Sequence, residues 1–193
     1  NRFSATPAAD ISGTLATGGD EVLGSLAGNG SVLLGGGTLT VGNAFDTTFG
    51  GSLGGPGGLA KVGDGMLTLS GASSYTGGTQ VAAGRLALAG DDRLPAATAV
   101  TVDTGATLIL GGVQSVADLV LAGTLSGNGT LSAPTYALAG GTVTSGATLG
   151  AGALTSTGTS LLAGRAGAGT GRGLVAAPPL ALDRDKRDII SQG

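Results

Sequence analysis

The phrase Gly-x-Leu or Gly-x-Val recurs along most of the chain, and its spacing constrains the fold more than any other feature. Copies of the same phrase are separated by 19, 41 and 99 residues, in the pairs Gly65–Leu67 and Gly84–Leu86, Gly105–Leu108 and Gly146–Leu149, and Gly28–Gly30 and Gly127–Gly129. These separations are close to one, two and five times about 20 residues, a period that is typical of solenoid repeats. A chain with such internal repeats is expected to stack them into a continuous structure.

Within the phrases, leucine alternates with small residues. Leu67 and Leu69 flank Thr68, and Leu86 and Leu88 flank an alanine. Alternation with period two places the leucines on one face of a short strand, and the glycines mark the corners between strands. We therefore predict an all-β fold, a right-handed parallel β-helix (β-solenoid) of about nine short rungs, in which the four leucines point inward in adjacent rungs.

Two other classes of structure fit the sequence less well. Glycine accounts for 41 of 193 residues, but 41% of the residues are hydrophobic and only 11% are charged, so the chain can bury a core and is not disordered. Its glycines keep no three-residue period, which excludes collagen. An antiparallel sandwich also has short strands between turns, but it does not explain why the same phrases return at multiples of one period.

The composition excludes several functions. The chain has no Cys and no His, and therefore lacks thiol nucleophiles, the commonest metal ligand and the commonest general base. The net charge of −3 and the absence of a basic cluster argue against nucleic acid as a partner. No run of about 20 apolar residues is present, so we expect no membrane insertion. We predict a protein that is not an enzyme, without catalytic residues, cofactor or metal.

One stretch resembles a known family. Residues 57–71 read GGLAKVGDGMLTLSG and continue over residues 72–86 as ASSYTGGTQVAAGRL. This run resembles the autotransporter-associated β-strand repeat, also called the passenger-associated transport repeat, and weaker copies of its Gly-x-Leu phrases span residues 13–155. The resemblance implies a parallel β-helix, export from a Gram-negative bacterium, a secreted or cell-surface location and no catalytic residues.

We expect the aspartates and the two tyrosines to have structural roles. Most aspartates lie beside Gly, Thr or Pro, where we expect each to bond to the backbone of its own turn. Asp91 and Asp92 are expected in a loop between rungs, with a calcium site as the alternative. Tyr75 and Tyr136 are expected to pack at the rim rather than to form ligand platforms.

The C-terminal segment differs from the rest of the chain. We predict a solenoid over residues 1–163, followed by a Gly-rich linker and an irregular charged tail over residues 164–193. The sequence shows no amphipathic capping helix, and open solenoid ends can pair with further strands. We therefore expect a homo-oligomer or filament formed through the solenoid ends and the tail, whose self-association residues would be Leu180, Leu182, Ile189 and Ile190.

These features favour a non-catalytic extracellular structural β-solenoid, a self-associating subunit of a bacterial surface filament or matrix. The first alternative is a fragment of an autotransporter passenger that acts as an adhesin or a stalk, with a host or matrix surface as its partner. The second is a β-helix enzyme that acts on polysaccharide, which would need paired acids within about 10 Å on one face.

Overall fold

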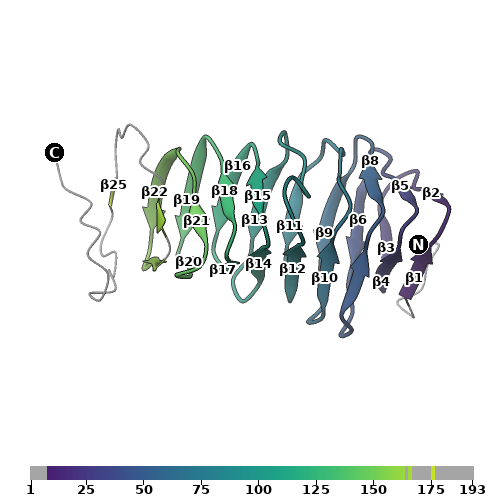
Figure 1. Cartoon of the computed structure of the whole chain (residues 1–193), viewed down its shortest axis with the longest axis horizontal. Coiled ribbons are helices and arrows are strands. Elements are labelled where there is room, and N and C mark those ends of the chain that lie inside the picture. Colours follow the sequence, from purple (N-terminus) through teal and green to yellow (C-terminus); the bar gives the residue numbers. More distant parts are fainter. Residues whose placement is uncertain (1–7, 164, 167–174, 177–193) are drawn as a thin grey trace.

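The computed structural model describes residues 8–163, 165–166 and 175–176, and its strands stack as a parallel β-solenoid (Figure 1). The strands of these residues pair in parallel. The described part of the chain contains no helix, and hence none that is long and apolar enough to cross a membrane. The predicted fold class is therefore confirmed.

Two nine-stranded sheets form two faces of the solenoid. The first sheet contains, in spatial order, β1 (Ala8–Ile11), β4 (Ser25–Gly28), β7 (Thr47–Phe49), β10 (Met66–Leu69), β12 (Arg85–Leu88), β14 (Thr107–Leu110), β17 (Thr124–Gly127), β20 (Thr142–Val143) and β23 (Leu161–Leu162). The second sheet contains β3 (Glu21–Leu23), β6 (Thr38–Val41), β9 (Gly58–Lys61), β11 (Thr79–Val81), β13 (Ala99–Val102), β16 (Asp118–Leu121), β19 (Thr135–Ala139), β22 (Ala153–Thr157) and β25 (Val175–Ala176).

The third face consists of two shorter sheets. One contains β2 (Thr14–Ala16), β5 (Ser31–Leu33) and β8 (Ser52–Gly54), and the other contains β15 (Val113–Ser115), β18 (Thr130–Ser132), β21 (Thr148–Leu149) and β24 (Arg165–Ala166). Between them, residues 70–78 and 89–98 connect the first sheet to the second without a strand of their own, apart from an isolated bridge between Leu53 and Ser73. One strand from each face, or the loop that replaces it, makes one rung.

The rungs repeat with the period that the sequence predicts. Consecutive partners in the first sheet lie between 17 and 22 positions apart, as Ala8 with Ser25 and Leu86 with Leu108 show. Leu67 pairs with Leu86, and Leu69 with Leu88, so the predicted register is confirmed. Nine rungs follow one another along the long axis, from β1–β3 at one end to β23–β25 at the other (Figure 1).

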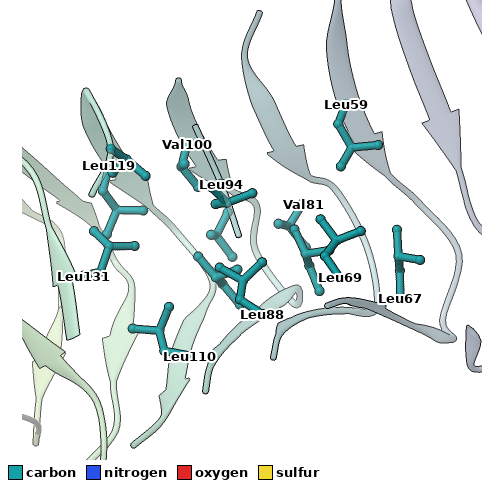
Figure 2. Packing of buried hydrophobic residues seen from close by; sticks show 14 of the residues in the cluster. Leu59, Leu67, Leu69, Val81, Leu88, Leu94, Val100, Leu110, Leu119 and Leu131 are labelled. Carbon is teal, nitrogen blue, oxygen red and sulfur yellow. The ribbon is translucent and has the colours of Figure 1, made fainter. Parts of the chain in front are cut away.

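The core is a set of apolar columns that run along the axis. One column in the first sheet passes through Leu67, Leu86, Leu108, Leu125 and Val143, all of which are at most 1% exposed. Figure 2 shows how side chains from the different faces meet in the interior, with Leu94 of the 89–98 loop among them. Because each rung has too few apolar side chains to enclose its own interior, the columns stabilise the rungs jointly.

The two Gly-Asn-Gly phrases occupy the same corner. Gly28 ends β4 and Gly127 ends β17, five rungs further along the first sheet, and both have a φ of +99°. A Cβ on Gly28 would lie 2.3 Å from the carbonyl oxygen of Ile11, and one on Gly127 would lie 2.2 Å from that of Leu110. Glycine is required here by both conformation and space.

The other repeated phrase does not return to the same face. Residues 107–108 belong to β14 in the first sheet, whereas residues 148–149 form β21 on the third face. The phrase specifies a turn followed by a short strand, and all three faces accept such a unit. Because the rungs differ in length, a separation of 41 residues does not determine the face.

Candidate functional site

Three aspartates connect successive rungs, one on each face. An Oδ1 atom of Asp20, Asp46 and Asp91 accepts a hydrogen bond from a backbone N–H of the next rung, at 2.7 Å in each case. The donors are the first residues of β6, β10 and β15, namely Thr38, Met66 and Val113. The expectation that these aspartates bond to their own turns is wrong, because each accepts from the first residue of a strand in the next rung.

Lys61 is the most unusual polar residue of the described core. It is 2% exposed and lies in a column between Val41 and Val81. Its Nζ atom donates hydrogen bonds to the carbonyl oxygens of Val62 at 2.6 Å, Gly63 at 2.8 Å and, more weakly, Ala83 at 3.4 Å. The ammonium group thereby closes the corner between the second and first sheets and joins two rungs.

Burial and nearby charges act on this ammonium in opposite directions. Desolvation lowers the pKa of Lys61, and the charge of Arg85 lowers it further, whereas Asp64 and Asp46 raise it. The role of this lysine was not predicted, although the alternation Leu59-x-Lys61 already places it on the inward face.

The same corner presents charged and aromatic groups to solvent. Arg85 Nη2 lies 3.7 Å from Asp46 Oδ2, and both side chains are more than half exposed, so this ion pair contributes little to stability. Phe45, which precedes Asp46, is 74% exposed. We call Phe45, Asp46, Asp64 and Arg85 the charged corner.

The loop over residues 89–98 replaces a third-face strand and is held from both sides. Gln114, which is fully buried, accepts hydrogen bonds from the backbone N–H groups of Arg93 at 2.8 Å and Leu94 at 3.2 Å, and donates one to the carbonyl oxygen of Gly90 at 2.7 Å. Arg93 Nη1 donates to the carbonyl oxygen of Ser70 at 2.7 Å. The loop thus connects β15 to the 70–78 loop of the preceding rung.

This geometry does not support the calcium alternative. Asp91 already accepts the N–H of Val113, and Asp92 is exposed with a φ of +51°. Across the described ranges, no group of three or more Asp, Glu, His or Cys side chains comes together to hold a metal ion. Asp91 and Asp92 lie in a loop, as predicted, but this loop replaces a third-face strand within one rung and does not join two rungs.

The two tyrosines lie in the core, so the expectation of rim packing is wrong. Tyr75 is fully buried, its hydroxyl shares a hydrogen bond with that of Thr79 at 2.5 Å, and burial raises its pKa to about 12. Thr79 in turn contacts the hydroxyl of Thr98 at 3.3 Å. Tyr136 is 2% exposed; its hydroxyl accepts the N–H of Ala133 and donates to the carbonyl oxygen of Leu131. Polar partners inside the core make this burial possible.

An open trough of about 550 Å³ lies where the third face meets the second sheet. Paired glycines from three successive rungs line it, Gly36 and Gly37, Gly57 and Gly58, and Gly77 and Gly78. The flanking side chains are small or uncharged, among them Thr38, Gln80 and Thr101, and the lining contains no ionisable group. The trough therefore lacks the acids that a glycosidase would require.

Both ends of the described solenoid present strand edges. The first-rung strands β1, β2 and β3 pair on one side, with β4, β5 and β6, and the last-rung strands β23, β24 and β25 pair on one side, with β20, β21 and β22. Apolar side chains at both ends are only partly buried, namely Ile11, Leu15, Leu154 and Leu162. The proposed self-association residues Leu180, Leu182, Ile189 and Ile190 lie outside the described residues.

Glu21 stands at the first of these ends. It is paired with Leu39 at an inward-facing position of the second sheet, and the following rung carries Leu59 there. Its Oε2 atom is buried and has no hydrogen-bond partner among the described residues. A carboxylate oxygen in this condition is unfavourable and calls for a partner.

Comparison with known families identifies one segment of the chain. Residues 59–88 match the family described as Passenger-associated-transport-repeat. The matched segment runs from β9 to β12 and includes both Lys61 and the Tyr75–Thr79 pair. No curated protein and no solved structure matches the chain. A β-solenoid with this repeat fits a segment of an autotransporter passenger, and the repeat implies a secreted or surface protein of a Gram-negative bacterium.

Proposed function

Because residues 59–88 form a passenger-associated-transport repeat within a β-solenoid, we propose that the chain is a non-catalytic extracellular structural protein that associates with itself into a surface filament or matrix. The observation that carries this proposal is the pair of solenoid ends. Both present strand edges in the same order of first sheet, third face and second sheet. The last rung of one copy therefore matches the first rung of another, strand for strand.

Pairing between copies would continue all three faces. The strand edges supply backbone donors and acceptors, which favour the addition of further strands. The half-buried apolar residues Ile11 and Leu15 at one end, and Leu162 at the other, would lose their remaining exposure. Such a contact joins two different surfaces and does not close on itself, so repetition produces a filament. Leu180, Leu182, Ile189 and Ile190 would add apolar area to the same contact.

The location of acidic residues supports a role without catalysis. Asp20, Asp46 and Asp91 each use a carboxylate oxygen to hold the next rung, and the trough contains no acid. Hydrolysis of a glycosidic bond requires two carboxyl groups that face one substrate site. Activity of the purified protein on a panel of polysaccharides would contradict the proposal and favour the enzyme alternative.

A passenger segment that acts as an adhesin or a stalk is the second candidate function. The repeat over residues 59–88 favours it, because in a longer passenger further rungs of the same chain would continue the two ends. The two candidates differ in what the ends contact: another copy, or the flanking chain. The charged corner, with its exposed Phe45, would then be available to a host or matrix surface.

Concentration-dependent assembly tests the first candidate. We expect the purified chain to show light scattering that rises with time and concentration, and filaments in electron micrographs. Deletion of residues 177–193, which leaves β25 in place, should weaken assembly, and serine at Leu180, Leu182, Ile189 and Ile190 should reproduce the effect. A chain that stays monomeric at high concentration would contradict self-association. Equal assembly by the shortened chain would contradict the role of the tail alone.

A further inference from the structure

The two Gly-Asn-Gly phrases each contain an Asn-Gly bond, the dipeptide whose asparagine side chain loses ammonia most readily. Residues 28–30 form the first Asn-Gly corner, with Asn29 at its centre, and residues 127–129 form the second, with Asn128 at its centre. The reaction begins when the backbone nitrogen of the following glycine attacks the side-chain Cγ, and glycine has no side chain to obstruct the approach. Both asparagines are exposed, and both follow a glycine with a φ of +99°. The two corners are therefore matched in chemistry and in access to water.

In the folded chain, stacking of the rungs occupies the nitrogen that would attack. Gly30 N donates a hydrogen bond to the carbonyl oxygen of Ile11 at 2.7 Å, and Gly129 N donates one to the carbonyl oxygen of Leu110 at 3.1 Å. Each acceptor belongs to the preceding rung. A nitrogen whose N–H is held by this carbonyl cannot lose its proton and turn toward the neighbouring carboxamide. The reaction therefore requires the corner to separate from the rung before it.

The two corners differ in how well the preceding rung is buried. Leu110 and Gly129 are buried at the second corner, whereas Ile11 and Gly30 are only partly buried at the first. The rung that contains Ile11 is the first of the described rungs, and the rung that contains Leu110 has described neighbours on both sides. Local opening is easiest where few buried contacts hold a segment. The first corner should thus open more often than the second, although its hydrogen bond is the shorter one.

We propose that Asn29 is a site of spontaneous deamidation in the folded protein, and that the covering rung keeps Asn128 unreactive. The nitrogen of the following glycine loses its proton and bonds to Cγ, and the side-chain nitrogen leaves as ammonia. Water then opens the succinimide ring at either carbonyl carbon, which gives aspartate or β-linked isoaspartate. This inference does not depend on self-association.

Conversion at Asn29 should weaken the rungs that meet at the first corner. Isoaspartate lengthens the backbone by a carbon atom, and the corner has no room for it, because even a Cβ on Gly30 would collide with the carbonyl oxygen of Gly13. The same carbonyl accepts the N–H of Ser31 at 2.8 Å, so a longer backbone would displace this bond. The side chain of Asn29 also lies against Gly50 of the next rung, where the product would place a negative charge.

Incubation of the full chain at mildly alkaline pH tests the inference. Peptide mass spectrometry follows the loss of each side-chain amide with time, at a protein concentration that shows no light scattering. In the folded chain, we expect Asn29 to react about tenfold faster than Asn128, because the reaction proceeds only from the open corner. In denaturant the two should react at similar rates. Asn43, which precedes Ala44, is the internal control and should be the slowest of the three there.

A variant tests whether coverage causes the difference. Leu110→Ala keeps the carbonyl acceptor but removes packing from the rung that covers the second corner, so the rate at Asn128 should rise several-fold while that at Asn29 stays unchanged. Leu67→Ala, the same change at a buried position remote from both corners, is the matched control and should alter neither rate. Circular dichroism verifies that each variant folds.

Equal rates at Asn29 and Asn128 in the folded chain would overturn the inference, as would an unchanged rate at Asn128 in a folded Leu110→Ala protein. Should that variant not fold, urea below the unfolding transition replaces it. The rate at Asn29 should then rise at lower urea than the rate at Asn128, and a simultaneous rise would also contradict the inference. Since the chain is kept below the concentration at which it scatters light, these outcomes are separate from the test of self-association.

Discussion

The middle rungs and the last rungs of the solenoid use the same parallel pairing, but they are held together differently. In the segment over residues 59–98, the main strands have three or four residues, and buried polar groups of Lys61, Tyr75 and Thr79 connect neighbouring parts of the chain. In the last rung, β23, β24 and β25 have two residues each, and Leu161 and Leu162 are only partly buried. The middle rungs bury large polar side chains, whereas the last rung is joined to the preceding strands by the small hydroxyl of Ser160, which donates to the carbonyl oxygen of Leu138.

This comparison indicates where the solenoid is most stable. A buried side chain in the middle contacts rungs above and below, whereas a side chain near an end is covered from one direction. In a stacked repeat, stability is the sum of terms within rungs and between neighbours. Within the described residues, the last rung lacks one of the neighbour terms, so we expect it to open before the middle rungs do.

The largest expected effect comes from placing a charge in the two regions. Leu69 is 1% exposed and lies between Phe49 and Leu88, whereas Leu154 in β22 is only partly buried. Leu69→Asp should lower the free energy of unfolding by about 4 kcal/mol or more, because the carboxylate has no partner there. Leu154→Asp should cost about 1–2 kcal/mol, since water can reach the charge. Urea denaturation measures both, and equal losses would contradict the difference between middle and end.

A smaller effect is expected at Lys61. Lys61→Met keeps an unbranched side chain but removes the donor for the carbonyl oxygens of Val62 and Gly63, and should cost about 2–3 kcal/mol. Arg85→Met, at a half-exposed position of the charged corner, is the control and should cost less than about 0.5 kcal/mol. A Lys61→Met protein as stable as the unaltered one would show that the ammonium does not hold the corner.

The pH dependence of stability separates Lys61 from Tyr75. Because the folded-state pKa of Lys61 is lowered below 10.5, the unfolded chain binds the proton more strongly. The contribution of this residue therefore increases as pH rises from the folded pKa to 10.5 and is fully present above that value. Lys61→Met should remove this rise, which chemical denaturation at pH 8–10.5 measures.

The contribution of Tyr75 to stability should decrease as pH rises, opposite to that of Lys61, and at a higher pH. Its pKa of about 12 lies above the ordinary value of 10.0, so its contribution is complete below pH 10 and is lost as pH rises toward 12. Two pKa steps correspond to roughly 2–3 kcal/mol. Tyr75→Phe should cost about 1 kcal/mol at pH 7, through loss of the bond to Thr79, and should flatten the alkaline decline. If the stability of the variant declined equally at alkaline pH, groups other than Tyr75 would be responsible for the decline.

Much of the fold could be predicted from particular residues. The pairs Leu67 with Leu86 and Leu69 with Leu88 lie where the alternation and the 19-residue separation place them. The shared corner of Gly28 and Gly127 follows the same period across five rungs. The two copies of Gly-Ala-Thr-Leu lie on different faces, because the motif itself does not specify the length of the corners between its copies.

Less of the candidate site could be predicted. The aspartates were expected at corners, but their acceptor role toward the next rung depends on a donor about 20 residues away. The role of Gln114 was not predicted, since its three hydrogen bonds hold the 89–98 loop, whose path the sequence does not reveal. The tail residues Leu180, Leu182, Ile189 and Ile190 stay a prediction.

By itself, the sequence determined the class of fold, the period of the rungs and the inward direction of the leucines. All three follow from local alternation and from recurrence along the chain, which need no knowledge of distant contacts. Only the tertiary structure decided the roles of the polar residues at core positions. Lys61 closes a corner, Tyr75 shares a buried hydrogen bond, and Glu21, at one end, has a carboxylate oxygen without a hydrogen-bond partner. The physical reason is that a polar group acquires its role from the atoms stacked above and below it, and the neighbouring rungs supply those atoms.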